Sequence, residues 1–253
     1  MRIAIEIGTH TARAAYLDAT GAPRLIRMAD GGTVLPAMAR QTMHGLVVGA
    51  EAAQALVGNA ETTVLGCTRL MGRAGALPAE LIRHLPYSVR DFGGEAVCNL
   101  LYAEVRASEV YGRIARALVD AAQAELGQPI DAVALVVPAS AEDRFRVQAR
   151  AALEAQGIRV ARLINQPTAA LLGIGRPEPG AANALTAVVA CSGGATEVSI
   201  AEWTDTGVRV RATAVDPLLG GDDIAWGVAE RLLRPSWRRP RRWPCRERGQ
   251  KRW

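Results

Sequence analysis

Leu163-Ile164-Asn165-Gln166-Pro167-Thr168-Ala169-Ala170-Leu171-Leu172-Gly173-Ile174-Gly175 is the stretch that decides the fold. The apolar and β-branched residues at 160–164 predict a short buried strand. Pro167 favours the first turn of a helix, because the N–H that proline lacks would be unpaired there anyway. The sequence therefore predicts a strand that runs directly into a helix. The small residues of that helix suit close packing between two lobes.

A strand and a helix precede this stretch. Ala132–Val137 is a continuous apolar run, as expected of a strand covered on both faces. Ser140 lies three residues before Asp143, and this spacing predicts a capping box for a helix that ends at Gly157. The order strand, helix, strand, helix predicts a βαβα unit with parallel strands.

Two hairpins with glycine turns lie at the starts of the two halves of the chain. The first is predicted from residues 3–7, with its turn at Gly8. The second is predicted over residues 185–200, with its turn at 192–194, and another strand follows at 208–214. A glycine turn between strands presents backbone N–H groups in a concavity that suits phosphate oxygens.

The segment between the first hairpin and the βαβα unit has mixed patterning. A third strand is predicted near residues 25–28, the periodicity is poor over 33–99, and a helix is predicted over 105–126. Arg69 and Arg73 are four residues apart, and we expect them to form salt bridges on the surface.

Five motifs, in the right order, resemble those of the Hsp70 chaperone family. They are Glu6-Ile7-Gly8-Thr9, Thr68-Arg69-Leu70-Met71-Gly72-Arg73, Asn165-Gln166-Pro167-Thr168-Ala169-Ala170, Ser192-Gly193-Gly194-Ala195 and Leu219-Gly220-Gly221-Asp222-Asp223. The resemblance implies an α/β fold of the actin-like ATPase superfamily, with ribonuclease-H-like lobes. It implies a complete first lobe over residues 1–175, with a peripheral subdomain at about 34–104, and a partial second lobe over 184–233. The last motif is expected to supply an acidic N-cap for a following helix.

The resemblance also implies a site for ATP or ADP with Mg²⁺. Phosphoryl transfer needs positioned phosphates, a magnesium ion whose waters are held by carboxylates, and a nearby cation or base. The family's catalytic positions are occupied here by Glu6, Thr68, Gln166, Ala190 and Ala195. Among these, Glu6 alone is a carboxylate, and we expect it to hold a metal ion weakly and through water. The chain's only lysine, Lys251, lies in the C-terminal tail and cannot replace the lysine lost at Thr68.

These replacements predict that ATP turnover is absent, because losing one preorganised electrostatic group already costs about 10²–10³ in rate. Phosphate contacts would remain at Gly8, Thr9, His10, Gly193 and Gly194. The alternative is that these glycines only form tight hairpin turns. The family's adenosine motif is missing, so we expect any nucleotide affinity to be weak and equal for ATP and GTP.

Three classes of function stay open, of which the third is a nucleic-acid binder that acts through the basic tail described below. One is an Hsp70-like nucleotide-binding domain fragment, a weak or inactive ATPase that lacks the peptide-binding domain. The second is an actin-like scaffold or interaction protein that acts without nucleotide turnover. Ending the second lobe after Leu233 leaves its strands uncovered, so we expect the chain to oligomerise, to aggregate or to need a partner such as a co-chaperone.

The last twenty residues differ sharply in charge from the rest. Residues 234–253 hold eight Arg and one Lys against one Glu, a net charge of +8, whereas the whole chain is +5, so the first 233 residues are −3. This basic, disordered tail is either the product of a shifted reading frame or an Arg- and Trp-rich segment that contacts nucleic acid or an acidic membrane surface.

No apolar run reaches the roughly 18 residues that span a bilayer, and no signal-peptide pattern opens the chain, so we expect a cytoplasmic protein. The chain has four widely spaced cysteines, Cys67, Cys98, Cys191 and Cys245. Their spacing indicates neither a zinc site nor a disulfide framework. His44 and His84 are expected to be solvated.

Overall fold

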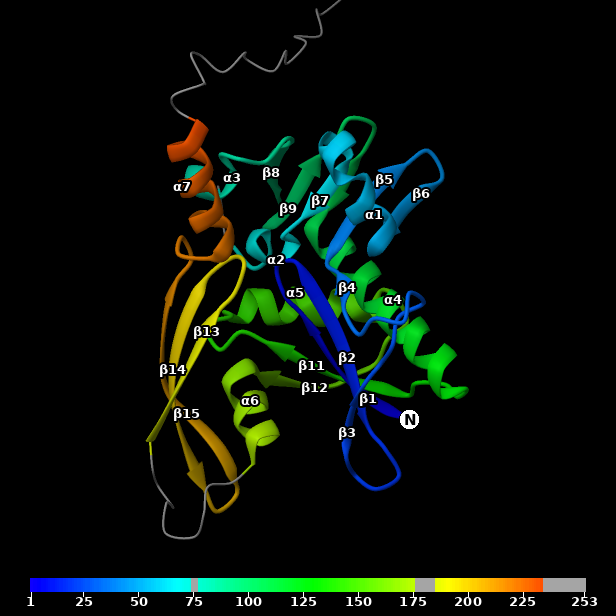
Figure 1. Cartoon of the computed structure of the whole chain (residues 1–253), viewed down its shortest axis with the longest axis vertical. Helices are drawn as coiled ribbons and strands as arrows, with labels where there is room; N and C mark the ends of the chain where they lie inside the picture. The colour runs from blue at the N-terminus through cyan, green and yellow to red at the C-terminus, as the bar shows by residue number, and fades with distance from the viewer. Residues whose placement is uncertain (74–76, 176–184, 234–253) are drawn as a thin grey trace, which may run out of the picture.

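The computed structural model describes residues 1–73, 77–175 and 185–233. Its elements form two lobes (Figure 1). The central part of the first lobe consists of β1 (Arg2–Ile7), β2 (Thr11–Leu17), β3 (Pro23–Leu25), β4 (Leu35–Pro36), β11 (Ala132–Val137), β12 (Val160–Asn165), α4 (Ala107–Leu126), α5 (Asp143–Glu154) and α6 (Gln166–Ile174). The predicted hairpin and βαβα unit are therefore both present.

One sheet organises this lobe, with strand order β12-β11-β1-β2-β3 and with β4 paired to β2. β1 pairs antiparallel with β2 and parallel with β11, and β11 pairs parallel with β12. β1 is thus hydrogen-bonded on both edges. The third strand begins at Pro23, earlier than predicted, because Pro23, Arg24 and Leu25 pair with the end of β2.

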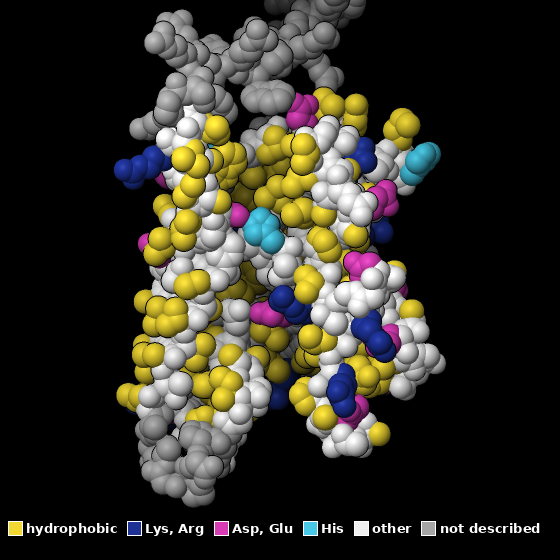
Figure 2. All heavy atoms as spheres, in the orientation of Figure 1, with side chains coloured by type: hydrophobic (Ala, Val, Ile, Leu, Met, Phe, Trp, Pro, Cys, Tyr) yellow, Lys and Arg dark blue, Asp and Glu magenta, His cyan; other side chains and the backbone are white. Residues whose placement is uncertain are grey.

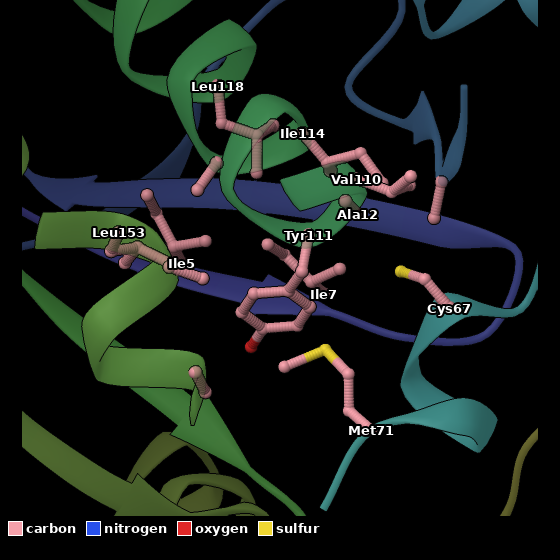
Figure 3. Close-up of a cluster of buried hydrophobic side chains, with 14 of the residues drawn as sticks. Ile5, Ile7, Ala12, Cys67, Met71, Val110, Tyr111, Ile114, Leu118 and Leu153 are labelled. Carbon is pink, nitrogen blue, oxygen red and sulfur yellow. The ribbon is translucent and has the colours of Figure 1, made fainter. Parts of the chain in front are cut away.

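The core of the first lobe lies between this sheet and α4. Val110, Ile114 and Leu118 repeat at the spacing of one helix face and are buried. Figure 3 shows them with side chains of β1 and α2 around Tyr111, whose ring meets the Phe145 ring edge-on at 6.2 Å. The helix starts at Ala107, two residues later than predicted, because the residues before it form a strand.

The helix α5 differs from its prediction at both ends. It begins at Asp143 and ends at Glu154, and its N-cap position is Glu142, with no side-chain cap. The predicted capping box at Ser140 was wrong. The backbone N–H of Ser140 donates instead to a carboxylate of the second lobe, which holds this residue outside the helix.

The peripheral part of the first lobe is built from two small sheets and short helices. It contains β5 (Met38–Thr42), β6 (Gly45–Val48), β7 (Thr63–Leu65), β8 (Ser88–Phe92), β9 (Glu95–Asn99), β10 (Glu104–Arg106), α1 (Ala50–Ala55), α2 (Cys67–Leu70), α3 (Ala79–Ile82) and the 3₁₀ turns η1 (Leu56–Gly58) and η2 (Ala60–Thr62). Cys67 and Cys98 are buried here, and burial raises the pKa of each thiol to about 12. Cys191 is exposed, whereas Cys245 lies outside the described residues.

The described second lobe contains β13 (Leu185–Cys191), β14 (Thr196–Thr204), β15 (Gly207–Asp216) and α7 (Gly221–Leu233). The strands form one antiparallel sheet in the order β13-β14-β15. Its inner face packs on α6 through Leu171, Ala201 and Trp203. Because α6 also contacts β11 and β12, it lies between the two lobes, as its small residues predict.

The predicted linker at 176–183 and the basic tail at 234–253 lie outside the described residues. Within the described residues, no helix is long and apolar enough to cross a membrane.

Candidate functional site

A cavity of about 650 Å³ lies between the lobes, at the ends of β1 and β11. The hollow between the two lobes is visible in Figure 2. Eight of the predicted site residues line the cavity: Glu6, Gly8, Thr9, Thr68, Gln166, Ala190, Gly194 and Ala195. His10 and Gly193 are not among the lining residues, and they lie where the two glycine turns meet.

Glu6 and Gln166 contact each other at the base of the cavity. Glu6 is carried near the end of β1, and Gln166 is the first residue of α6, directly after β12. The Gln166 side-chain amide donates a hydrogen bond of 3.0 Å to the Glu6 carboxylate. This bond occupies one carboxylate oxygen with a neutral donor.

The residues here do not fit a magnesium ion. Thr68, Ala190 and Ala195 line the cavity without any charged group, and Gln166 uses its amide on Glu6. Among residues 1–73, 77–175 and 185–233, no cluster of three or more His, Cys, Asp or Glu side chains is arranged to hold a metal ion. Mg²⁺ requires near-octahedral oxygen ligation, usually anchored by one or two carboxylates.

The two glycine turns are in direct contact with each other. A Cβ atom on Gly193 would lie 2.5 Å from the His10 ring, and one on Gly194 would lie 2.6 Å from the Arg69 side chain. These glycines therefore permit close approach of the lobes as well as tight turns. The side chains of His10 and Arg69 are the groups that these glycines let approach.

His10 Nε2 donates a hydrogen bond to Asp222 of α7, with 2.5 Å between this nitrogen and the nearer carboxylate oxygen. Its predicted role was to donate to an anion. The anion that it meets in this structure is a carboxylate of the second lobe.

Arg69 connects the lobes and is not a surface residue, contrary to the sequence-based interpretation. Its side chain is 14% exposed and forms ion pairs with Asp222 at 3.5 Å and Asp223 at 3.0 Å. It also donates to the Pro217 carbonyl at 3.2 Å. We call the group His10, Arg69, Asp222 and Asp223 the inter-lobe clamp.

The two aspartates of the clamp lie in the first turn of α7, and neither is the predicted N-cap, because the helix begins at Gly221. The carboxylate of Asp223 reaches back to the N–H of Gly220 at 2.9 Å. Burial opposes ionisation of Asp223, yet this N–H and the Arg69 guanidinium hold the pKa of its carboxyl below the usual range.

Glu197 is a cavity residue that the sequence reasoning missed. It is 5% exposed, and its carboxylate accepts hydrogen bonds from the N–H groups of Ala139 and Ser140, which follow β11. A signal was present, because Glu197 alternates with Ser199 and Ala201 on the inward face of a strand, where an unpaired charge is costly.

Arg73 was also not predicted as a site residue, because only a lysine was expected to replace the cation lost at Thr68. It lines the cavity, and its Nε donates to the Arg69 carbonyl. Burial and the neighbouring Arg69 lower the pKa of its guanidinium. A cation is therefore present in the cavity.

A second contact joins the lobes above the cavity. Arg83 pairs with Glu230 of α7, and the His84 ring stacks on Trp226 at 4.2 Å between centroids. The expectation that His84 is solvated was wrong, whereas His44 is exposed as expected.

Comparisons with known proteins agree with this architecture. The model of the Hsp70 protein family matches residues 2–236. The chain is 31% identical to the chaperone protein HscA homolog of Bordetella petrii, covering 91% of this chain and 36% of the relative. It is 33% identical to the chaperone protein dnaK1 of Prochlorococcus marinus and 32% identical to the chaperone protein dnaK of Emiliania huxleyi, again over 91% of this chain.

The chain spans just over a third of the length of these relatives, 35–37%. Its two lobes have the actin-like ATPase fold that the motifs imply. From the family match and the shared sequence, the chain belongs to the Hsp70 family.

Proposed function

We propose that this chain is an Hsp70-type nucleotide-binding module that does not turn over ATP. The observation that carries the proposal is the hydrogen bond from the Gln166 amide to the Glu6 carboxylate. An amide at this position cannot accept a proton or hold the waters of a metal ion as an anion. Ala190 faces the same cavity from the other lobe and supplies no ligand.

Nucleotide binding, in this proposal, is weak and depends on phosphate contacts. Thr9, Arg73 and the turn at Gly194 line the cavity and offer hydroxyl, guanidinium and backbone donors. Three carboxylates, those of Glu6, Glu142 and Glu197, line it as well and oppose an anion. Affinity for ATP or ADP, with or without Mg²⁺, should therefore be low, and ATP and GTP should bind equally.

The test is a measurement of phosphate release by the full chain, with ATP and with magnesium present or chelated. We expect no hydrolysis above background in either condition. Glu6→Ala serves as the matched control and should give the same background rate. Magnesium-dependent turnover that disappears in Glu6→Ala would overturn the proposal, because it would show that one carboxylate organises the metal ion.

A gain-of-site variant sharpens this test. Gln166→Glu with Ala190→Asp restores two carboxylates facing the cavity. Calorimetry should then detect magnesium-dependent nucleotide binding at least tenfold tighter than in the unmodified chain, corresponding to about 1.4 kcal/mol. Equal affinity in both proteins would contradict the role given to these positions.

A second candidate function is that of an interaction protein that acts without nucleotide turnover. It is favoured by the surface of α7, in which no residue is buried although Ile224, Val228 and Leu232 form an apolar stripe. Large exposed apolar surfaces mark sites of protein association.

A further inference from the structure

Gln148 of α5 binds two segments of the first lobe that are far apart in the sequence. Its side-chain carbonyl oxygen accepts the N–H of Gly72 at 2.8 Å, and its side-chain NH₂ group donates to the Gly94 carbonyl at 2.8 Å. Gly72 follows α2, whereas Gly94 lies in the turn between β8 and β9. Both ends of the amide are in use, so a single side chain joins the two segments.

The segment around Gly72 carries two cations that face the second lobe or the cavity. Gly72 lies between Arg69 and Arg73, and the Arg73 Nε donates to the Arg69 carbonyl at 3.0 Å. Arg69 forms the ion pairs of the inter-lobe clamp, and Arg73 lines the cavity. A shift of Gly72 therefore moves the backbone that carries both guanidinium groups.

Gly72 packs so closely against α5 that it admits no side chain. It is buried, its φ is +77°, and a Cβ on it would lie 2.5 Å from the Cβ of Phe145. Phe145 and Gln148 are three residues apart and lie on the same face of α5. The packing contact and the hydrogen bond therefore fix the position of Gly72 together.

The other end of the amide binds an exposed two-residue turn. Gly93 and Gly94 have φ of +64° and +83°, and a type I′ turn requires positive φ at both positions. A Cβ on Gly94 would collide with the Arg144 guanidinium of α5, whereas a Cβ on Gly93 would meet nothing within 4 Å. Gly94 is thus the residue of the turn that packs on α5.

We propose that Gln148 is a positioning residue that couples the β8–β9 turn to the inter-lobe clamp. While the turn is held against α5, the amide holds Gly72, and Gly72 keeps Arg69 within reach of its two aspartates. Displacing the turn removes one of the two anchors of the amide, and the clamp then opens more often. This coupling does not depend on whether the cavity binds nucleotide.

The test is amide exchange of α7 in the full chain, which measures how often the clamp opens. Gln148→Met keeps the length of the side chain, removes both hydrogen bonds and should speed α7 exchange at least about threefold. In an Arg69→Met background the same change should have no further effect, because the clamp is already broken. The matched control is Gln123→Met in α4, which removes a hydrogen bond from Arg116 and should leave α7 exchange unchanged.

Displacing the turn tests the coupling from its other end. Gly94→Ala pushes the turn away from α5 and should also speed α7 exchange, but only where Gln148 is present. Gly93→Ala adds the same methyl group at a positive φ of the same turn without touching α5, and should leave α7 exchange unchanged.

Exchange of β11, which lies in the buried core, reports global unfolding and should rise less than that of α7 in each variant. The proposal is overturned if Gln148→Met leaves α7 exchange unchanged, or if its effect adds fully to that of Arg69→Met. It is also overturned if Gly94→Ala acts no more strongly than Gly93→Ala, or if exchange of α7 and β11 rises equally.

Discussion

The two lobes start from the same element and are completed differently. Each begins with a hairpin whose glycine turn faces the cleft. In the first lobe, β11, β12 and α4 cover the hairpin and produce a large buried core. In the second, the described core consists of Leu171, Ala201 and Trp203 with a few partly buried neighbours. A hairpin therefore supplies the backbone of the site, but the stability of the hairpin depends on the elements that cover it.

The difference between the lobes extends to the cleft. The first lobe contributes the polar side chains of Glu6 and Thr9 to the cavity, whereas the second contributes the alanines Ala190 and Ala195. At its base, Gln166 and Glu6 contact each other. The lobes are held together by the inter-lobe clamp.

The largest expected effect comes from making one substitution in the main helix of each lobe. Leu118→Ala in α4 removes a side chain that is 0% exposed and should reduce the free energy of unfolding by about 2–5 kcal/mol. Leu232→Ala in α7 truncates a side chain that is 71% exposed and should change it by less than about 0.5 kcal/mol. Urea denaturation of both variants measures the difference. An equal loss in the free energy of unfolding for both variants would show that α7 is covered in solution.

An intermediate effect is expected from breaking the inter-lobe clamp. Arg69→Met leaves Asp222 and Asp223 without their cation, and local opening of α7 should become easier by about 1–3 kcal/mol. Amide exchange of α7 measures this opening. Arg24→Met, which breaks an exposed pair with Asp18, is the control and should leave α7 exchange unchanged.

The clamp also predicts a pH dependence. Because the pKa of Asp223 is depressed in the folded chain, its stabilisation is present above the ordinary value of 3.8 and is lost as pH falls through the folded value. The difference in thermal stability between the unmodified chain and Arg69→Met should therefore shrink from pH 7 toward pH 3. A difference that stays constant would contradict ion pairing as its source.

The last comparison concerns one glycine in each of the same two helices. Ala is the better helix former by about 1 kcal/mol, so Gly227→Ala in α7, with nothing within 4 Å of the new Cβ, should stabilise its helix. Gly112→Ala in α4 places a Cβ 2.5 Å from the Ala152 carbonyl oxygen and should destabilise by about 1–3 kcal/mol. Thermal unfolding and amide exchange measure whether each variant is stabilised or destabilised. Stabilisation in both helices would mean that α4 and α5 can separate at no cost.

Sequence patterns predicted the strands and long helices because each depends on a local period. The run Ala132–Val137 and the junction at Gln166 were placed correctly. Helix starts were less predictable: the capping box at Ser140 failed, because a carboxylate from the other lobe binds its N–H group. A rule based on neighbouring residues cannot include Glu197, which lies 57 residues away and binds the N–H group of Ser140.

By itself, the sequence determined the family and the order of elements, because motifs and residue identities are properties of the chain alone. Only the tertiary structure decided where charges are neutralised. Arg69 finds its partners 153 and 154 residues away, and Glu197 finds its donors 57 and 58 residues away.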